Sequence, residues 1–223
     1  MADAFPAERL HERRLYLCTA DRPDLAEFVE ACIVGGVDIV QLRDKRLDAR
    51  PLIARAVIAR EICAKHGVPF ILNDRPDLAL ACEADGVHVG QDDVPAAAAR
   101  RILGVGAIIG MSTHSPAQWT AAADEPVGYL SAGPVNATPT KPGRPGTGLG
   151  YLDFVSSSPT AETTPWFVTG GANPDTVDEM AAHGARRFVA VRYLTESADP
   201  EASARSLRAA IDRHWDLPKT ALA

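Results

Sequence analysis

Cysteine is scarce in this sequence, and the few cysteines present lie far apart. Four occur in 223 residues, with no CxxC pair and no compact group of cysteine and histidine. Such spacing argues against a disulfide framework and against a structural zinc site. We therefore expect free thiols in a reducing compartment at Cys18, Cys32, Cys63 and Cys82.

Long apolar runs and a surplus of basic residues are also missing. Residues 1–14 contain no apolar core of a secretion signal, and no apolar run approaches the length of a transmembrane helix. The 23 lysines and arginines are outnumbered by 29 aspartates and glutamates, for a formal net charge of -6. Nucleic-acid and membrane-surface proteins normally carry a basic face, so we expect neither partner. We expect a cytoplasmic protein that acts on small molecules.

Short apolar runs alternate with longer amphipathic ones along the chain. The apolar runs are rich in Val, Ile, Leu and aromatic residues, and several lack polar alternation, which is typical of parallel strands covered on both faces. The expected strands are 15–19, 38–43, 70–73, 86–89, 107–112, 128–132, 166–169 and 187–191. The expected helices are 24–35, 50–66, 94–103, 175–183 and 200–215, with a weaker one near 151–157.

Capping signals mark where several helices begin. Ser115-Pro116, Asn173-Pro174 and Asp199-Pro200 each place a capping side chain before a proline suited to the first helical position. These helix starts are consistent with eight strand–helix units, and 223 residues are a suitable length for one barrel. The expected fold is α/β, a single (β/α)8 TIM barrel over residues 1–223 with 1–14 as an amino-terminal extension. An open, doubly wound sheet is the alternative.

One predicted connection between a strand and a helix is unusually long. Residues 133–150 contain four prolines and five glycines, and the segment is too long for an ordinary connection between strand and helix. Long loops in compact domains are often binding loops or covers. We interpret residues 133–150 as a lid over an active site.

Polar residues follow the expected strands at their carboxyl ends, where TIM barrels carry their active sites. They comprise cations, carboxylates, hydroxyl and amide side chains, and a glycine pair. This mixture suits a polyanionic substrate together with a metal ion. The residues are Gln41, Arg43, Lys45, Asn73, Asp74, Gly90, Gln91, Asp92, Asp93, Ser112, Thr138, Thr140, Lys141, Gly170, Gly171 and Arg192.

Two carboxylates of this set, Asp74 and Asp93, follow neighbouring strands of the expected barrel. Carboxylates brought close together repel each other unless one is protonated or a cation lies between them. Magnesium fits, because it accepts one or two protein carboxylates and also binds substrate phosphates. The alternative is structural, because each aspartate precedes a proline-containing helix start and could cap that helix.

Other members of the set also have plain structural interpretations. Arg43 and Lys45 could form a solvated rim. Gly170-Gly171 could be a tight turn rather than a place where backbone N–H groups approach a phosphate. His88 lies within a strand and His114 just after one, so we expect packing and rim roles for them.

Five motifs occur in an order that resembles the thiamine-phosphate synthase family. Each motif is moderately specific, whereas the ordered set is highly specific and spans roughly residues 15 to 200. The motifs are GGVDIVQLRDK (35–45), PFILND (69–74), ADGVHVGQDD (84–93), GPVNATPTK (133–141) and GG (170–171).

The resemblance implies three groups of site residues. An aminopyrimidine diphosphate would be held by Gln41, Arg43, Lys45, Asn73, Ser112 and Lys141. The cofactor Mg²⁺ would be held by Asp74 and Asp93. A thiazole phosphate would be held by Thr138, Thr140, Gly171, Val191 and Arg192, of which Val191 comes from the resemblance alone. The candidate catalytic residues are Arg43, Lys45, Ser112 and Lys141.

The activity implied by the resemblance is that of a transferase in thiamine biosynthesis. It joins 4-amino-2-methyl-5-(diphosphooxymethyl)pyrimidine to 4-methyl-5-(2-phosphooxyethyl)thiazole and releases diphosphate. The thiazole nitrogen displaces the diphosphate, so the reaction needs no side-chain nucleophile, and cations would stabilise the charge on the leaving group. The resemblance also makes a homodimer plausible.

The sequence departs from the family pattern in three places. Val168 takes the place of the first glycine of a G-x-G-G motif, and Asp44 replaces the commoner glutamate. We expect these two changes to alter packing only. Asn136-Ala137 replaces an aromatic-proline pair beside the substrate-binding threonines, so we expect it to affect loop geometry and affinity.

There are three rival functions, and two of them, a tautomerase and an isomerase or epimerase, belong to barrels of similar fold. A thiazole tautomerase would carry a histidine directly after the glycine that follows the sixth strand, where this chain has Pro134, and tends to lack the carboxylates retained at Asp74 and Asp93. A non-catalytic binding protein for thiamine precursors would not require the retained cations and carboxylates. A phosphosugar isomerase or epimerase would require a positioned acid–base pair, and none is evident. The sequence favours the synthase.

Overall fold

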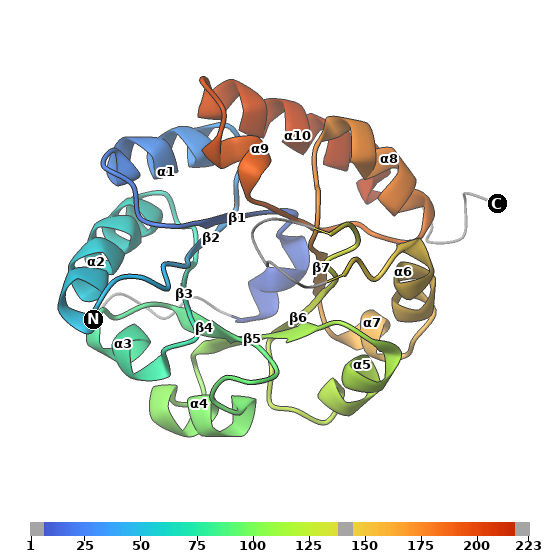
Figure 1. Cartoon of the computed structure of the whole chain (residues 1–223), viewed down its shortest axis with the longest axis horizontal. Coiled ribbons are helices and arrows are strands. Elements are labelled where there is room, and N and C mark those ends of the chain that lie inside the picture. The colour runs from blue at the N-terminus through green and yellow to red at the C-terminus, as the bar shows by residue number, and fades with distance from the viewer. Residues whose placement is uncertain (1–6, 138–144, 217–223) are drawn as a thin grey trace.

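The computed structural model describes residues 7–137 and 145–216. Within them, eight parallel strands close into a barrel in chain order, with β8 paired to β1 (Figure 1). The predicted (β/α)8 barrel is confirmed, and the open sheet is excluded. The strands are β1 (Leu15–Thr19), β2 (Ile39–Leu42), β3 (Phe70–Asn73), β4 (Gly86–Val89), β5 (Ile108–Thr113), β6 (Tyr129–Ala132), β7 (Trp166–Val168) and β8 (Phe188–Ala190).

Helices surround the barrel on its outer face (Figure 1). They are α1 (Leu25–Val34), α2 (Ala49–Lys65), α3 (Pro76–Ala81), α4 (Ala96–Leu103), α5 (Pro116–Ala122), α6 (Leu149–Ser156), α7 (Thr160–Thr163), α8 (Pro174–Ala182), α9 (Arg192–Thr195) and α10 (Pro200–Trp215). The five clear helices expected from the sequence are confirmed, and the weaker one near 151–157 corresponds to α6.

Both faces of the strands are buried because the barrel has two apolar layers. In β1, Tyr16 and Cys18 point into the barrel interior, whereas Leu15 and Leu17 pack in the layer between barrel and helices. This alternation has the period of two that strand geometry imposes. Because each layer is apolar, the sequence of a strand shows no polar alternation.

Besides the four-residue helix α7, two short elements have no counterpart in the sequence-based expectation. The 3-10 helix η1 (Ala7–Glu12) precedes β1, and its Leu10 is fully buried among the interior side chains of the barrel. Part of the predicted extension 1–14 therefore packs into the barrel from the amino-terminal ends of the strands. The second element, α9, follows β8 almost directly and begins with Arg192.

The predicted capping signals are confirmed. Ser115, Asn173 and Asp199 each accept a backbone N–H from the first turn of α5, α8 and α10, and each precedes a proline. These bonds satisfy N–H groups that a helix start would otherwise leave unpaired. The caps fix where each helix leaves its preceding loop.

The four cysteines are buried and free, as expected. Among the described helices, none is long and apolar enough to cross a membrane.

Candidate active site

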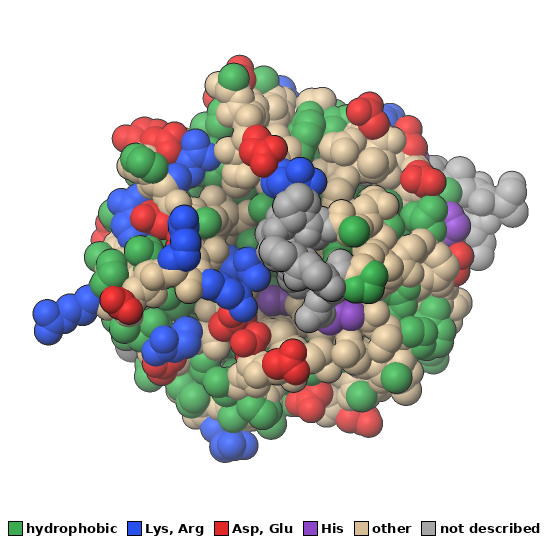
Figure 2. Space-filling model, viewed as in Figure 1, with side chains coloured by type: hydrophobic (Ala, Val, Ile, Leu, Met, Phe, Trp, Pro, Cys, Tyr) green, Lys and Arg blue, Asp and Glu red, His purple; other side chains and the backbone are tan. Residues whose placement is uncertain are grey.

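A cavity of about 560 Å³ opens at the carboxyl ends of the strands. Its lining comes from strand interiors and from the loops that follow the strands. Figure 2 shows basic, acidic and histidine side chains gathered near the centre of this face. A cavity of this size with convergent polar groups is typical of a small-molecule site.

Ten of the thirteen residues that the resemblance assigned to the site line this one cavity. They are Gln41, Arg43, Lys45, Asn73, Asp74, Asp93, Ser112, Gly171, Val191 and Arg192. The other three, Thr138, Thr140 and Lys141, lie outside the described residues, as does the central part of the predicted lid. The individual roles of all thirteen residues stay predictions.

Asp74 and Asp93 face each other after β3 and β4. Their carboxyl groups are close enough to hydrogen-bond, and Lys45 Nζ lies 2.8 Å from Asp74 Oδ2. Burial raises the pKa of Asp74, and Asp93 raises it further, although Lys45 opposes both effects. The pair thus concentrates negative charge that a further cation would relieve.

Neither carboxylate caps a helix, so the structural alternative for them is wrong. The residues at the N-cap positions of α3 and α4 are Arg75 and Pro95. Asp93 instead accepts the backbone N–H of Gly90 at 2.8 Å. Asp74 has a positive φ of 62°, a backbone conformation that is unfavourable for residues other than glycine.

The chemistry of this carboxylate pair suits magnesium. In the described part of the chain, no group of three or more His, Cys, Asp or Glu side chains could hold a metal ion. A site for zinc normally supplies at least three such protein ligands. Magnesium needs only one or two carboxylates, because it keeps water ligands and binds substrate phosphates. Asp74 and Asp93 therefore fit Mg²⁺ better than they fit zinc.

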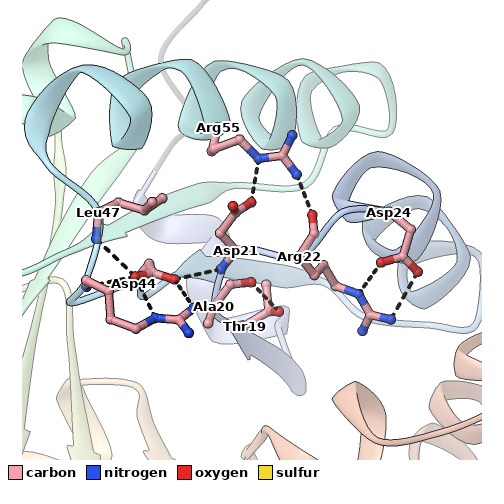
Figure 3. Close-up of polar contacts among 9 residues, drawn as sticks. Thr19, Ala20, Asp21, Arg22, Asp24, Asp44, Leu47 and Arg55 are labelled. Carbon is pink, nitrogen blue, oxygen red and sulfur yellow. Dashed lines mark hydrogen bonds and ion pairs between the residues drawn. The ribbon is translucent and has the colours of Figure 1, made fainter.

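The buried carboxylate of Asp44 organises the loop between β2 and α2 (Figure 3). The same loop carries Arg43 and Lys45. Asp44 accepts the backbone N–H of Arg46 at 2.8 Å and pairs with the Arg46 guanidinium at 2.7 Å. It also accepts the backbone N–H of Leu47 at 3.2 Å. The expectation that Asp44 acts through packing only is too narrow, because its carboxylate fixes the backbone beside both cations.

The same carboxylate joins this loop to the loop after β1. Asp44 accepts the backbone N–H of Asp21 at 3.3 Å. Arg55 of α2 pairs with the Asp21 carboxylate and donates to the backbone carbonyl of Arg22 (Figure 3). Three chain segments are therefore tied together next to the mouth of the cavity.

We expect Asp44→Asn to destabilise the fold in a pH-dependent way. The hydrogen-bonded Arg46 guanidinium lowers the pKa of Asp44 from 3.8 to about 2. Because the folded-state pKa is depressed, the stabilisation is complete above about pH 4 and is lost as the pH falls toward 2. A shift of this size corresponds to about 2 kcal/mol at neutral pH.

Urea denaturation of the wild type and Asp44→Asn between about pH 7 and pH 3 measures this effect. The difference in unfolding free energy should shrink as the pH falls. Asp48→Asn is the matched control, because Asp48 is an exposed aspartate of the same loop. A difference that stays constant across this range would contradict the assignment.

The turn after β7 approaches the loop after β6 closely. Gly170 and Gly171 have φ values of +100° and +98°. A Cβ on Gly170 would lie 2.5 Å from the backbone nitrogen of Val135, so this approach requires glycine. Asn136, which departs from the family pattern, donates its side-chain N–H to the Gly170 carbonyl at 3.3 Å. Arg192, which follows the neighbouring strand β8, lines the cavity with Gly171.

Sequence reasoning missed the floor of the cavity. Tyr16, Cys18, Ser131 and Val189 line it, and so does His88, for which we expected a packing role. In strands buried on both faces, the residue pattern does not reveal which side chains point inward. A polar residue within an otherwise apolar strand, such as His88 or Ser131, is the signal that could have identified them.

The closed barrel and the charged cavity at the carboxyl ends of its strands define a TIM-barrel enzyme. The family model described as thiamine monophosphate synthase matches residues 15–194. This chain belongs to the thiamine-phosphate synthase family, whose members are transferases of thiamine biosynthesis.

Curated relatives support this membership. A thiamine-phosphate synthase from Thermobifida fusca is 52% identical over 206 residues, which cover 90% of this chain and 93% of the relative. One from Saccharopolyspora erythraea is 47% identical over 209 residues, with 90% and 93% coverage. This similarity extends over nearly the whole length of both relatives.

Solved structures agree with the fold. A thiamine phosphate pyrophosphorylase from Pyrococcus furiosus superposes with a TM-score of 0.81 at 27% identity, covering 92% of this chain and 98% of that one. A 3-hexulose-6-phosphate synthase superposes with a TM-score of 0.65 at 18% identity, covering 88% and 99%. The second similarity concerns the fold alone.

Proposed function

We propose that this chain joins the aminopyrimidine diphosphate to the thiazole phosphate, with magnesium assisting the departure of diphosphate. The observation that carries the proposal is the meeting of two facing carboxylates with two cations in one cavity. Asp74 and Asp93 lie beside Lys45, and Arg43 lines the same space. A phosphate-rich substrate and a divalent cation together would balance these charges.

The diphosphate would bind on the side of the cavity formed by β2, β3 and β4. Arg43 can donate two parallel hydrogen bonds to one phosphate group, and Lys45 supplies a compact positive charge. Lys45 is held at Asp74, so it is oriented before any substrate arrives. Lys141, assigned here by the family resemblance, would add a third cation.

Magnesium, held by Asp74 and Asp93, would supply positive charge that stabilises the diphosphate as it leaves. Neighbouring groups hold the two carboxylates in fixed orientations. The hydrogen bond from Gly90 orients Asp93, and the close approach of Lys45 orients Asp74. This preorganisation places charge where the leaving group develops it.

The aminopyrimidine ring would lie deeper in the cavity. Gln41, Asn73 and Ser112 line it from β2, β3 and β5. Amide and hydroxyl side chains can donate to and accept from the edge of a nitrogen heterocycle. Binding the ring below the cations would direct its methylene carbon toward the centre of the cavity.

The thiazole phosphate would bind on the opposite side, near β7 and β8. Gly171 and Arg192 line the cavity there, and the glycine turn lets the backbone approach a phosphate closely. Val191 would contact the ring, and Thr138 and Thr140 are assigned by the family resemblance. Substrates on opposite sides would bring the thiazole nitrogen toward the pyrimidine methylene.

The reaction needs no side-chain nucleophile, because the thiazole nitrogen carries the attacking lone pair. The aminopyrimidine delocalises positive charge on its methylene, so a loose, carbocation-like path is the expected one. Such a path requires the exclusion of water. The loop 133–150 is the proposed cover, and Pro134 lines the cavity at its start.

Diphosphate release from the purified protein tests this function. We expect release that requires both precursors and magnesium, and that stops when excess EDTA is added. Omitting the thiazole phosphate is the internal control, because a hydrolase would release diphosphate without it. No release under any of these conditions would favour a tautomerase or a binding protein instead.

We further propose that the protein works in the cytoplasm as a homodimer. Its four buried free thiols support a reducing compartment. The dimer is proposed from the family resemblance alone.

A further inference from the structure

A continuous chain of hydrogen bonds runs beneath the cavity and joins two residues of the proposed pyrimidine site. Gln41 donates its side-chain N–H to the Tyr16 hydroxyl at 2.6 Å. The hydroxyls of Tyr16 and Tyr129 are 2.8 Å apart, and Tyr129 lies 2.9 Å from Nδ1 of His88. Nε2 of His88 lies 2.8 Å from the hydroxyl of Ser112. Five strands contribute one residue each to this chain, namely β1, β2, β4, β5 and β6.

The protons available in this hydrogen-bond chain determine which atom donates in each bond. Each phenol has one proton, and burial raises the pKa of Tyr16 and of Tyr129, so both hydroxyls stay protonated. The Gln41 amide nitrogen can only donate, and its oxygen accepts from the Cys18 thiol at 3.4 Å. Gln41 and Tyr129 are the partners of the Tyr16 hydroxyl, so the buried Tyr16 proton has an acceptor between them only if it goes to Tyr129.

The remaining bonds, from Tyr129 to Ser112, follow from this assignment. Because Tyr129 accepts from Tyr16, its own buried proton has an acceptor only at Nδ1 of His88, and this nitrogen is then unprotonated. His88 is then the Nε2–H tautomer and donates to the Ser112 hydroxyl. Ser131 donates to the same hydroxyl at 3.4 Å. A hydroxyl has two acceptor positions and one proton, so Ser112 is left with only its proton to offer.

We infer that this chain makes Ser112 an obligate hydrogen-bond donor to the substrate, and that Tyr129 is a positioning residue for the reaction. The inference rests on the proposed function, because it names the substrate edge that Ser112 meets. That edge must present an acceptor, such as a ring nitrogen of the aminopyrimidine. Tyr129 does not line the cavity and is fully buried, so it can act only through other residues.

The packing around Tyr129 holds its hydroxyl in place. A Cβ on Gly110 would lie 2.0 Å from Tyr129 Cζ, so only glycine leaves room for the ring there. The Tyr129 ring also makes edge-to-face contacts with Tyr16 and Phe167, at centroid distances of 5.8 and 5.5 Å. A ring locked on these sides keeps its hydroxyl between Tyr16 and His88.

The first test is spectroscopic and needs no activity. Nitrogen-15 NMR of the histidine rings in the full-length protein distinguishes a protonated from an unprotonated ring nitrogen, and His88→Gln identifies the His88 signals. We expect neutral His88 with Nδ1 unprotonated and Nε2 protonated. The opposite tautomer, or a charged ring, would overturn the inference even if the protein proves to be an active synthase. If the protein shows the expected tautomer but has no synthase activity, the hydrogen-bond chain is supported and the proposed function is rejected.

The second test is kinetic. Tyr129→Phe keeps the ring and removes the hydroxyl that connects Tyr16 to His88. We expect kcat/KM for the pyrimidine diphosphate to fall about tenfold, with the KM for the thiazole phosphate nearly unchanged. The His88 tautomer should also become mixed, which a loss of packing alone would not cause.

Tyr151→Phe is the matched control. The Tyr151 hydroxyl is also buried and donates to the Thr113 hydroxyl at 2.8 Å. Thr113 lies on β5, as Ser112 does, but neither Tyr151 nor Thr113 belongs to the hydrogen-bond chain. We expect this variant to keep both kinetic constants and the His88 tautomer. Equal losses in the two variants, or equal effects of Tyr129→Phe on both substrates, would show that Tyr129 has only a structural role.

Discussion

Replacing Arg43 with alanine should slow product formation about a hundredfold or more and leave the melting temperature almost unchanged. Lys45 is held 2.8 Å from Asp74, whereas Arg43 has no ion-pair partner within residues 7–137 and 145–216. Arg43 nevertheless lines the cavity. A cation without an internal partner contributes little to folding, so its charge is available for a bound diphosphate.

Steady-state rates and thermal melts of three variants test this expectation. Arg43→Lys keeps the charge but loses the planar fork, so its rate should lie between those of wild type and Arg43→Ala. Arg50→Ala removes the same charge from an exposed position at the start of α2, and it should keep nearly full activity. A similar rate loss in Arg50→Ala would mean that general electrostatic attraction, rather than contact with Arg43, governs the rate.

The barrel could be predicted from the sequence because local and global signals agree. Strands covered on both faces are apolar throughout, and capping residues such as Ser115 and Asn173 mark the helices between them. The position of the cavity follows from the fold, since parallel strands end on one side of a barrel. The sequence alone therefore predicts that most of the proposed site residues lie together at the carboxyl ends of the strands.

The contacts that tune the site could not be predicted, because they join residues far apart in the sequence. Asp44 meets the backbone of Asp21 only after β1 and β2 have paired. Tyr129 lies 41 positions from His88, and nothing in the sequence of either strand indicates that these two side chains meet. The short helix η1 carries too few residues for a periodic signal, and it forms against the barrel interior through Leu10.

Asp93→Asn should remove most magnesium-dependent turnover, about a hundredfold or more, without destabilising the metal-free protein. Asparagine has nearly the same shape and can still accept the N–H of Gly90. The substitution also removes a negative charge that faces Asp74, whose pKa is raised by burial and by Asp93. Because like charges repel, the metal-free variant should melt at the wild-type temperature or above it.

Thermal melts with and without magnesium separate binding from folding. Magnesium should raise the melting temperature of the wild type, because it binds the folded state, and should leave that of Asp93→Asn unchanged. Asp124→Asn is the control, since it removes the same charge from an exposed position outside the cavity and should keep the magnesium response. If Asp93→Asn lost stability and activity together without magnesium, Asp93 would be a structural residue of the loop after β4. A full magnesium response with normal turnover would instead place the metal elsewhere.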